Sequence, residues 1–488
     1  MPRIQKLLPT VFACALAAGA IGAAPALASH SQSTYFEGSS DLLSARTRPH
    51  ALTQMQTLGV RALRIELSWF NVAPGQTSTT KPAFDMTNPG NYAWGEYDAL
   101  IAEAQRLHWK VLLTLTSPVP RWATSNKKAP YVTKPDPKDF QEFMTAVARH
   151  YGPSGPFGST VSLFSIWNEP NHPAFLQPQW NTNGTAASPR LYRALYQAGY
   201  AGLQAGGIAK PNVLIGETAP TGYDSVNYKR EKSKALLHDV APLLFLRETL
   251  CLNAKYKKSG SCTPLTAVGY AHHAYSTAAG PLYKKWPKDD VTIAVLSRLS
   301  SALSKAAAAH GVTSNLPIYL TEFGVQSKPN RFLGVPVGQQ AEYDAIAEKI
   351  AWSNSRVAAF SQYLLIDDPQ GGKPGSSVNG GTIGFQTGLE YLNGKPKPLY
   401  FGFPVPLTVT KSGHSFSLWG LVRPAAGATK VTVLVQSKGS SKYKTLKTVT
   451  TNGSGYWTLH SSTQGAHWRV RWVSPTGVKY EGPPIGAH

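Results

Sequence analysis

Short apolar runs alternate with longer amphipathic stretches from about residue 35 to residue 404, and no other feature constrains the fold as strongly. This alternation is typical of βα units, in which a buried parallel strand is followed by a helix that covers the sheet. The apolar runs predict strands at Tyr35–Gly38, Ala62–Leu67, Val111–Leu115, Leu163–Ile166, Val213–Gly216, Val268–His273, Ile318–Thr321 and Ala358–Leu364. The longer stretches predict helices that include Pro137–His150, Pro189–Ala205, Val291–His310 and Gln339–Ser353.

Eight such units favour a closed barrel over an open, doubly wound sheet. The open sheet is the structural alternative, but no glycine-rich phosphate loop follows the first strand, which counts against its dinucleotide-binding form. We therefore predict an α/β fold, a (β/α)₈ TIM barrel, over residues 30–404.

The texture of the sequence changes around residues 394–406, where prolines cluster and short alternating strands replace the βα pattern. These strands are predicted at Phe416–Leu421, Val431–Gln436, Lys444–Val449, Tyr456–Leu459 and Trp468–Val473. The pattern indicates an antiparallel, immunoglobulin-like β-sandwich over residues 405–488. Such a module is either a spacer or an anchor that attaches the protein to a surface.

The first 28 residues have the features of a secretory signal. Arg3 and Lys6 precede an apolar, alanine-rich stretch, and residues 26–28 form an A-x-A cleavage motif. The stretch is short and interrupted by glycines, which disfavours the alternative of a membrane anchor, and no other segment approaches the ~20 apolar residues that span a bilayer. We expect a secreted, extracellular protein without a transmembrane segment, beginning at Ser29.

Export also bears on the cysteines. Cys14 leaves with the signal, whereas Cys251 and Cys262 bracket a short polar, basic loop. A disulfide between these two is expected in an exported protein. Zinc is only weakly indicated, because no histidine stands beside either cysteine, and we predict neither a metal nor a cofactor.

The formal net charge of +22 has two explanations. A basic surface attracts an acidic polymer or the cell envelope. Alternatively, the charge reflects solubility and a general bias toward basic composition. Nucleic acid is not a predicted partner, because no known binding motif accompanies the charge.

Two glutamates stand just past predicted strands four and seven. Glu169 lies in Trp-Asn-Glu-Pro-Asn and Glu322 lies in Thr-Glu-Phe-Gly. The catalytic groups of such barrels lie at the carboxyl ends of the strands. Retaining glycosidases use two carboxyl groups about 5–5.5 Å apart, one to protonate the leaving oxygen and one to attack the anomeric carbon.

These motifs resemble clan A of the glycoside hydrolases, cellulase-like family five or a related family. The resemblance implies that Glu169 is the acid/base and Glu322 the nucleophile. It also implies that Arg64, in a segment similar to strand two of that family, holds Glu322, and that His273 and Tyr275 lie beside the nucleophile. Strand three lacks the histidine pair common in family-five cellulases, so the resemblance does not extend to cellulose as substrate.

The environment of each group follows from its role. Arg64 and Tyr275 would favour ionised Glu322 through charge and hydrogen bonding. Glu169 should have a raised pKa, because a general acid must begin protonated. Asn168 is placed to bond a sugar 2-hydroxyl.

Other residues near the strand ends have competing interpretations. Glu37, Glu66 and Glu217 lie in or near strands and either contact substrate or form structural ion pairs. Arg64 could balance Glu66 within the barrel instead of holding Glu322. Of the two adjacent histidines, we predict His273 and not His272 as the site residue. The alternative interpretation is that both are core histidines.

Aromatic rings provide flat faces on which sugars stack. We predict Trp69 and Trp122 as substrate-binding platforms, with Trp167 and Tyr275 as further candidates. Trp94, Trp180 and Trp286 lie in predicted loop regions and could extend the cleft. For each ring the alternative is packing.

The sequence therefore predicts a secreted retaining glycoside hydrolase that cleaves an extracellular polysaccharide, oligosaccharide or glycoside. The alternatives are a carbohydrate-binding protein that has lost catalysis, and a protein whose β-module anchors it to a surface. Both glutamates are present, which argues against lost catalysis.

Overall fold

The structure is a computed structural model, and it describes residues 32–37, 39–125, 131–330, 333–369 and 384–488. The predicted signal, residues 1–28, lies outside the described residues, as does Gly38 at the end of the first predicted strand.

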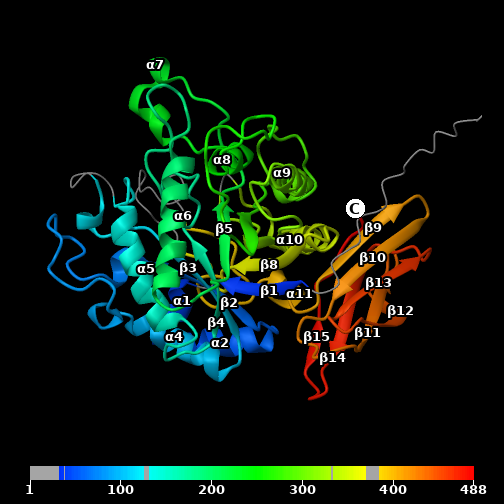
Figure 1. Cartoon of the computed structure of the whole chain (residues 1–488). Helices are drawn as coiled ribbons and strands as arrows, with labels where there is room; N and C mark the ends of the chain where they lie inside the picture. Colours follow the sequence, from blue (N-terminus) through cyan, green and yellow to red (C-terminus); the bar gives the residue numbers. More distant parts are fainter. Residues whose placement is uncertain (1–31, 38, 126–130, 331–332, 370–383) are drawn as a thin grey trace, which may run out of the picture.

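Eight parallel strands form a closed barrel in sequence order, so the predicted (β/α)₈ TIM barrel is confirmed (Figure 1). The barrel closes where β1 pairs with β8, from Ser33 opposite Ala359 to Glu37 opposite Tyr363. The strands are β1 (Ser33–Glu37), β2 (Ala62–Ser68), β3 (Lys110–Thr116), β4 (Val161–Ile166), β5 (Val213–Thr218), β6 (Gly269–His273), β7 (Ile318–Glu322) and β8 (Val357–Tyr363).

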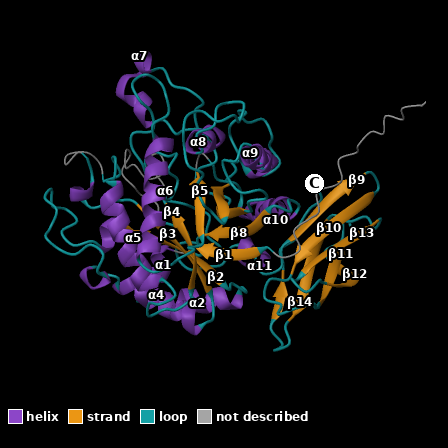
Figure 2. Ribbon diagram, viewed as in Figure 1, coloured by secondary structure: helices purple, strands orange, loops and turns teal. Residues whose placement is uncertain are grey.

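Helices surround the barrel (Figure 2). They are α1 (Ser39–Leu43), α2 (Arg48–Thr57), α3 (Trp69–Val72), α4 (Gly95–Arg106), α5 (Pro137–Tyr151), α6 (Ser188–Ala205), α7 (Tyr228–Glu231), α8 (Pro242–Thr249), α9 (Ser297–Ala308), α10 (Val337–Trp352) and α11 (Pro398–Gly402). Local chemistry sets their ends: the Asp136 side chain caps α5 by accepting from the backbone N–H groups of Lys138 and Asp139, and Pro137 occupies the first turn.

The range Val291–His310, predicted as one helix, is a short 3₁₀ turn (Ile293–Val295) followed by α9. The difference has a backbone cause. Thr292 has an extended backbone, with φ −89° and ψ 171°. The N–H groups of Val291 and Ile293 donate to the carbonyls of Pro220 and Ala274 in other parts of the barrel, so this segment is held extended and the helix begins after it.

The inside of the barrel is built in layers, because alternate residues of a strand point to the same side. One apolar layer draws a residue from each of seven strands: Tyr35, Ala62, Leu112, Leu163, Leu214, Ala271 and Ala359. Two positions further along six of these strands, the buried residues are polar: Glu37, Arg64, Thr114, Ser165, His273 and Ser361. An apolar plug therefore lies directly beneath a buried polar layer at the carboxyl ends of the strands.

The C-terminal part is a separate β-module with two antiparallel sheets, as predicted for a β-sandwich. The last barrel helix, α11, ends at Gly402 and the first module strand begins at Leu407, on either side of the predicted boundary. One sheet has the order β13-β10-β9 and the other β12-β11-β14-β15. The strands are β9 (Leu407–Ser412), β10 (Ser415–Leu421), β11 (Lys430–Gln436), β12 (Tyr443–Thr450), β13 (Tyr456–Ser461), β14 (His467–Val473) and β15 (Lys479–Glu481).

The module packs on the barrel through its three-stranded sheet. Trp419 and Tyr456 form a small buried cluster with Trp352 at the end of α10, and the Trp352 and Trp419 rings lie 5.7 Å apart. Beside them Arg423 donates to both carboxylate oxygens of Glu348 on α10, at 3.0 and 2.9 Å. Among the described residues, the four-stranded sheet touches the barrel at its edge, where the hydroxyl of Tyr480 on β15 donates to the carbonyl of Thr57 on α2.

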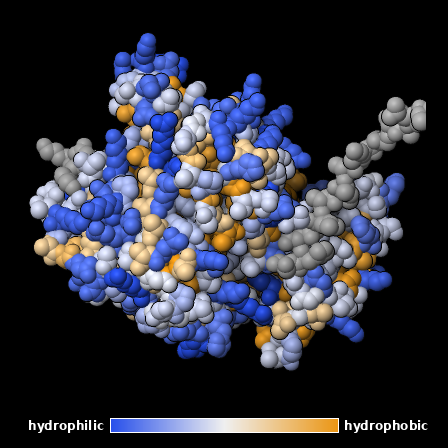
Figure 3. Space-filling view, viewed as in Figure 1, coloured by the Kyte–Doolittle hydropathy of each residue, from blue (hydrophilic) through white to orange (hydrophobic). Residues whose placement is uncertain are grey.

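No described helix is both long and apolar enough to cross a lipid bilayer. On the face drawn in Figure 3, hydrophilic residues predominate and apolar residues occur in small, scattered groups.

The predicted disulfide is present and joins Cys251 to Cys262, with the two Cα atoms 6.3 Å apart. Cys251 follows α8 and Cys262 precedes β6, so the bond lies at the amino-terminal end of the barrel strands. Catalytic groups of such barrels lie at the opposite end.

Replacing both Cys251 and Cys262 by serine should lower the free energy of unfolding by about 2–3 kcal/mol, because the unfolded chain regains the freedom of an 11-residue separation. Denaturant unfolding would measure this loss. The geometry at the carboxyl ends of the strands should be unaffected. A variant as stable as the parent would show that the disulfide does not stabilise the fold.

Candidate active site

Glu169 follows β4 on a strained turn that its neighbours hold in place. Trp167 and Glu169 both have positive φ values, 76° and 35°, which residues other than glycine rarely adopt. Three backbone bonds fix the turn: Trp167 N–H donates to the Leu115 carbonyl, Asn168 N–H to the Thr116 hydroxyl, and Glu169 N–H to the Glu217 carbonyl. The strain is thus balanced by β3 and β5 on either side.

Glu322 ends β7 and is almost fully buried, with 7% of its surface exposed. Arg64 Nη1 donates to Glu322 Oε1 at 2.7 Å, and the Tyr275 hydroxyl donates to Oε2 at 2.9 Å. The predicted contacts of Arg64 and Tyr275 with Glu322 are therefore present.

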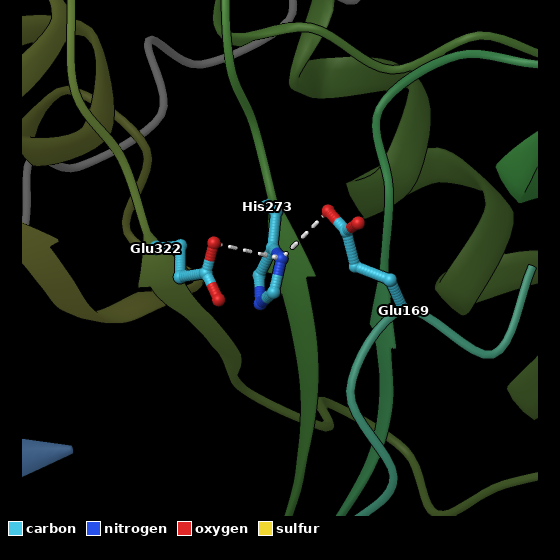
Figure 4. Close-up of side chains that lie close together, drawn as sticks. All are labelled: Glu169, His273 and Glu322. Carbon is cyan, nitrogen blue, oxygen red and sulfur yellow. Dashed lines mark hydrogen bonds and ion pairs between the residues drawn. The ribbon is translucent and has the colours of Figure 1, made fainter. Parts of the chain in front are cut away.

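His273, the last residue of β6, lies between the two glutamates (Figure 4). Its Nδ1 is 3.0 Å from Glu169 Oε1 and 3.4 Å from Glu322 Oε2. One oxygen of each glutamate and a ring nitrogen of His273 all lie within 4.8 Å of one another. The two predicted catalytic carboxylates thus face each other across a single imidazole.

Arg64 is buried and contacts more carboxylates than its charge can balance. Besides Glu322, its guanidinium binds both oxygens of Glu217, at 3.1 and 3.0 Å, and donates to Glu66 at 3.1 Å and to Glu37. It also donates to Asn168 Oδ1 at 2.9 Å, which orients that amide. Arg64 therefore both holds Glu322 and balances Glu66, the two roles that the sequence left open.

Burial and crowding of negative charge raise the pKa of these carboxyl groups. Burial is the largest cause for Glu169 and raises its pKa to about 7; nearby His172 opposes that shift and Asp239 adds to it. Burial also raises the pKa of Glu322, although His273 and Arg64 oppose the shift by charge. The pKa of Glu37 is raised well above its ordinary value, again chiefly by burial.

Within the part of the chain that the structure describes, two groups of three side chains offer atoms close enough to share a cation, Glu169–His273–Glu322 and Glu37–Glu66–Glu322. In both groups Glu322 is also bonded by Arg64, and in the second all three carboxylates contact that guanidinium. Since Arg64 already supplies positive charge at the centre of the cluster, we assign these groups to ion pairing and hydrogen bonding.

The structure contradicts the prediction that Trp69 and Trp122 are sugar platforms. Trp69 is 0% and Trp122 4% exposed. The Trp69 ring stacks on Phe143 at 5.2 Å and meets the Trp122 ring edge-on at 5.7 Å. Both rings are packing residues, because both are buried among other aromatic side chains.

Most other predicted aromatic candidates are also buried. The rings of Trp94, Trp167 and Trp180 are at most 5% exposed. Trp286 and Tyr275 retain partial exposure, and Tyr275 lies against Glu322. Tyr275 is the one ring among these candidates that is both accessible and beside a predicted catalytic group.

His272 is a core histidine, in agreement with the preference for His273. It is fully buried, and its two ring nitrogens lie 2.9 Å from the Thr218 hydroxyl and 2.7 Å from the Val291 carbonyl. Burial lowers the pKa of His272 to about 3, so it stays neutral.

Sequence reasoning understated Glu37 and Glu217 and missed His172 and Asp239. His172 Nε2 and Asp239 Oδ1 are 3.8 Å apart, and both act on the charge of Glu169. Their place is visible only in three dimensions, since Asp239 belongs to the loop after β5. The one available signal for His172 was its position three residues after Glu169.

Comparisons with known proteins show the fold alone. No protein-family model matches the chain, and no curated protein matches its sequence. A glucosidase from Croceicoccus marinus is similar in structure, with a TM-score of 0.52 and 11% identity over 93% of this chain and 96% of that one. A family 39 glycoside hydrolase from Bacteroides cellulosilyticus has a TM-score of 0.51 and 14% identity, over 87% and 80%. Family five finds no support among these comparisons.

The chain of contacts from Glu217 to Glu169 can be tested by titration. Glu217 carries negative charge near Glu169 and raises its pKa by repulsion. Replacing Glu217 by glutamine should therefore lower the pKa of Glu169 from about 7. Carboxyl-labelled protein followed by NMR would report it.

The matched control is Glu103→Gln, which removes a carboxylate paired with Arg106 on the surface of α4. It should leave the Glu169 titration unchanged. Equal titration curves for the two variants would show that Glu217 does not act on Glu169.

Proposed function

We propose that this protein is a retaining glycoside hydrolase that acts on a carbohydrate outside the cell. The observation that carries the proposal is the pair of carboxylates at the ends of β4 and β7, with one oxygen of each within 4.8 Å. Inverting enzymes instead hold their carboxyl groups about 6.5–9.5 Å apart, to leave room for a water molecule. The names of the structural neighbours agree with a glycosidase.

In the proposed mechanism Glu169 begins protonated and donates its proton to the leaving oxygen. Its raised pKa, about 7, suits that role in mildly acidic solution. Glu322 attacks the anomeric carbon and forms a glycosyl-enzyme. Water then releases the sugar with Glu169 as base, so that the anomeric configuration is retained.

Arg64 and Tyr275 prepare Glu322 for attack. Each donates a hydrogen bond to a different oxygen of Glu322, which fixes the carboxylate plane. Asn168 is held by Arg64 through its amide oxygen, so its NH₂ group is free to face a sugar hydroxyl. The same guanidinium thereby aligns the nucleophile and a group proposed to bind substrate.

Export is part of the proposal. It rests on the signal-like residues 1–28 and on the disulfide, which is typical of oxidising compartments. The sugar, the linkage and the choice between endo and exo action depend on the loops around the cleft and are left to substrate screening.

The activity should depend on pH in a bell-shaped manner. It falls at high pH as Glu169 loses its proton, with the limb of kcat/KM near pH 7, the value to which burial raises the pKa of Glu169. It falls at low pH as Glu322 gains a proton, at a pKa above the ordinary glutamate value. A kcat/KM profile measured on an aryl glycoside would check both limbs, and an alkaline limb above pH 9 would exclude Glu169 as the acid.

The roles of the two glutamates separate by substitution. Glu322→Ala removes the attacking group and should reduce hydrolysis of every substrate to near background. Glu169→Ala removes the proton donor, so an activated aryl glycoside should still form the glycosyl-enzyme. Added azide should then restore its turnover, and NMR of the glycosyl azide should show the configuration of the substrate.

Two results would contradict the assignment. One is natural-substrate activity that survives Glu169→Ala. The other is an azide product with inverted configuration, which would indicate single displacement and therefore an inverting enzyme.

A further inference from the structure

The β-module concentrates positive charge to a degree that the barrel does not. Residues 405–488 contain ten lysines and arginines and one acidic residue, Glu481, whereas residues 29–404 contain 36 basic and 25 acidic residues. The excess of positive charge per residue is therefore several-fold higher in the module than in the barrel.

Most of this charge is exposed and without an acidic partner. All seven module lysines are exposed, and among the described residues none of them forms an ion pair. Five of the seven lie on the hairpin formed by β11 and β12, which has no acidic residue: Lys430, Lys438, Lys442, Lys444 and Lys447. Strand β12 is the free edge of its sheet, where lysine also prevents pairing with another chain.

The neighbouring strand β14 carries further cations. Its residues alternate: Trp468, Val470 and Trp472 are buried in the core, whereas His467, Arg469 and Arg471 point to the outer side. Arg469 and Arg471 share Glu481, at 3.0 and 2.7 Å, so two cations face one anion. The Arg469 guanidinium also lies over the Tyr443 ring of β12, 4.8 Å from its centre.

The position of this surface fits a docking role. The three-stranded sheet packs against α10 of the barrel through Trp419 and Tyr456, so the four-stranded sheet faces away from the barrel. Residues paired across strands share a side of the sheet, so Lys430 on β11 and Lys479 on β15 lie on the same outer side as Arg469 and Arg471, and we call this side the cationic sheet. Lys444 and Lys447 pair with core-facing Val435 and Val433 and therefore point to the other side of the β12 edge. The four tryptophans of the module are buried, which argues against recognition of neutral sugars by stacking on those rings.

We propose that the cationic sheet binds a polyanionic polysaccharide and holds the barrel beside it. Charge complementarity carries the proposal, because a linear polymer of carboxylated or sulfated sugars can run across the neighbouring strands β11, β14 and β15, each of which presents a cation on this side. The choice of a polysaccharide over other polyanions rests on the proposed function of the barrel. An anionic lipid surface also attracts basic residues, and the vesicle measurement distinguishes it from a polysaccharide.

The experiment uses the full chain with Glu322→Ala as background, so that hydrolysis cannot remove the ligand. The probe is polygalacturonate, with dextran as the neutral comparison, in affinity electrophoresis at several salt concentrations. The test variant adds Lys430→Gln, Arg471→Gln and Lys479→Gln. The control adds Lys138→Gln, Lys210→Gln and Lys255→Gln, exposed barrel lysines, and so removes the same charge.

We expect the background protein to bind polygalacturonate but not dextran, and binding to weaken as salt rises. The test variant should bind about tenfold more weakly, which corresponds to three exposed charges that each contribute a fraction of a kcal/mol. The control should bind as the background protein does. Thermal unfolding would establish that each variant is folded, and Lys430→Gln with Lys479→Gln, which leaves the ion pair of Arg471 in place, is the substitute if the test variant is not.

Equal weakening in the test and control variants would overturn the proposal, since binding would then follow net charge alone. Equal binding of dextran would overturn it too. Tighter binding to phosphatidylglycerol–phosphatidylcholine vesicles or to duplex DNA than to polygalacturonate would assign the surface to another polyanion. If the unsubstituted protein hydrolyses no glycan while the Glu322→Ala background still binds polygalacturonate, that result counts against the proposed function alone.

Discussion

The candidate site depends on one buried guanidinium. Arg64 contacts four glutamates and Asn168 from the middle of the barrel, and a single positive charge cannot neutralise all of these carboxylates if they are ionised. Burying charge without compensation is costly, so part of the negative charge must be removed by protonation. The raised pKa values of Glu37, Glu66 and Glu322 are the expected response. Arg64 thus fixes both the geometry and the protonation of the site.

The position of Arg64 follows from strand alternation and barrel closure. Residues two apart on a barrel strand point to the same side, so Ala62 can contribute to the apolar plug while Arg64 reaches the polar layer above it. Because all strands are parallel, their carboxyl ends meet in one layer, and residues from β1, β2, β5 and β7 converge there. A site of this kind needs no long loop to bring its charged groups together.

Local sequence was sufficient where a residue's role follows from its own strand. The eight strands, and the positions of Glu169 and Glu322 at the ends of two of them, were predictable because alternation and short motifs encode them. The contact of Arg64 with Glu322 followed from the resemblance to clan A glycoside hydrolases. Trp69 and Trp122 were predicted wrongly, since local sequence does not show whether a ring past a strand end faces the cleft or lies under a helix. Glu217 was underweighted for a related reason: its partner Arg64 lies across the barrel.

Two module strands were missed for local reasons. Strand β9 follows Pro404 and Pro406, which obscure the start of its alternation, and β15 has three residues, too few to show a period. Both strands were recognisable only by their pairing partners, β10 and β14.

Arg423 of the module also affects the stability of the barrel. Its guanidinium donates to Thr34 on β1 and to Glu348 on α10, the helix that precedes β8, so it joins both sides of the seam at which the barrel closes. A residue near the end of the chain thereby helps to tie its first and last barrel strands together. Contacts that join the two parts couple their unfolding. The barrel and the module should accordingly unfold together in one cooperative transition, and not as two independent domains.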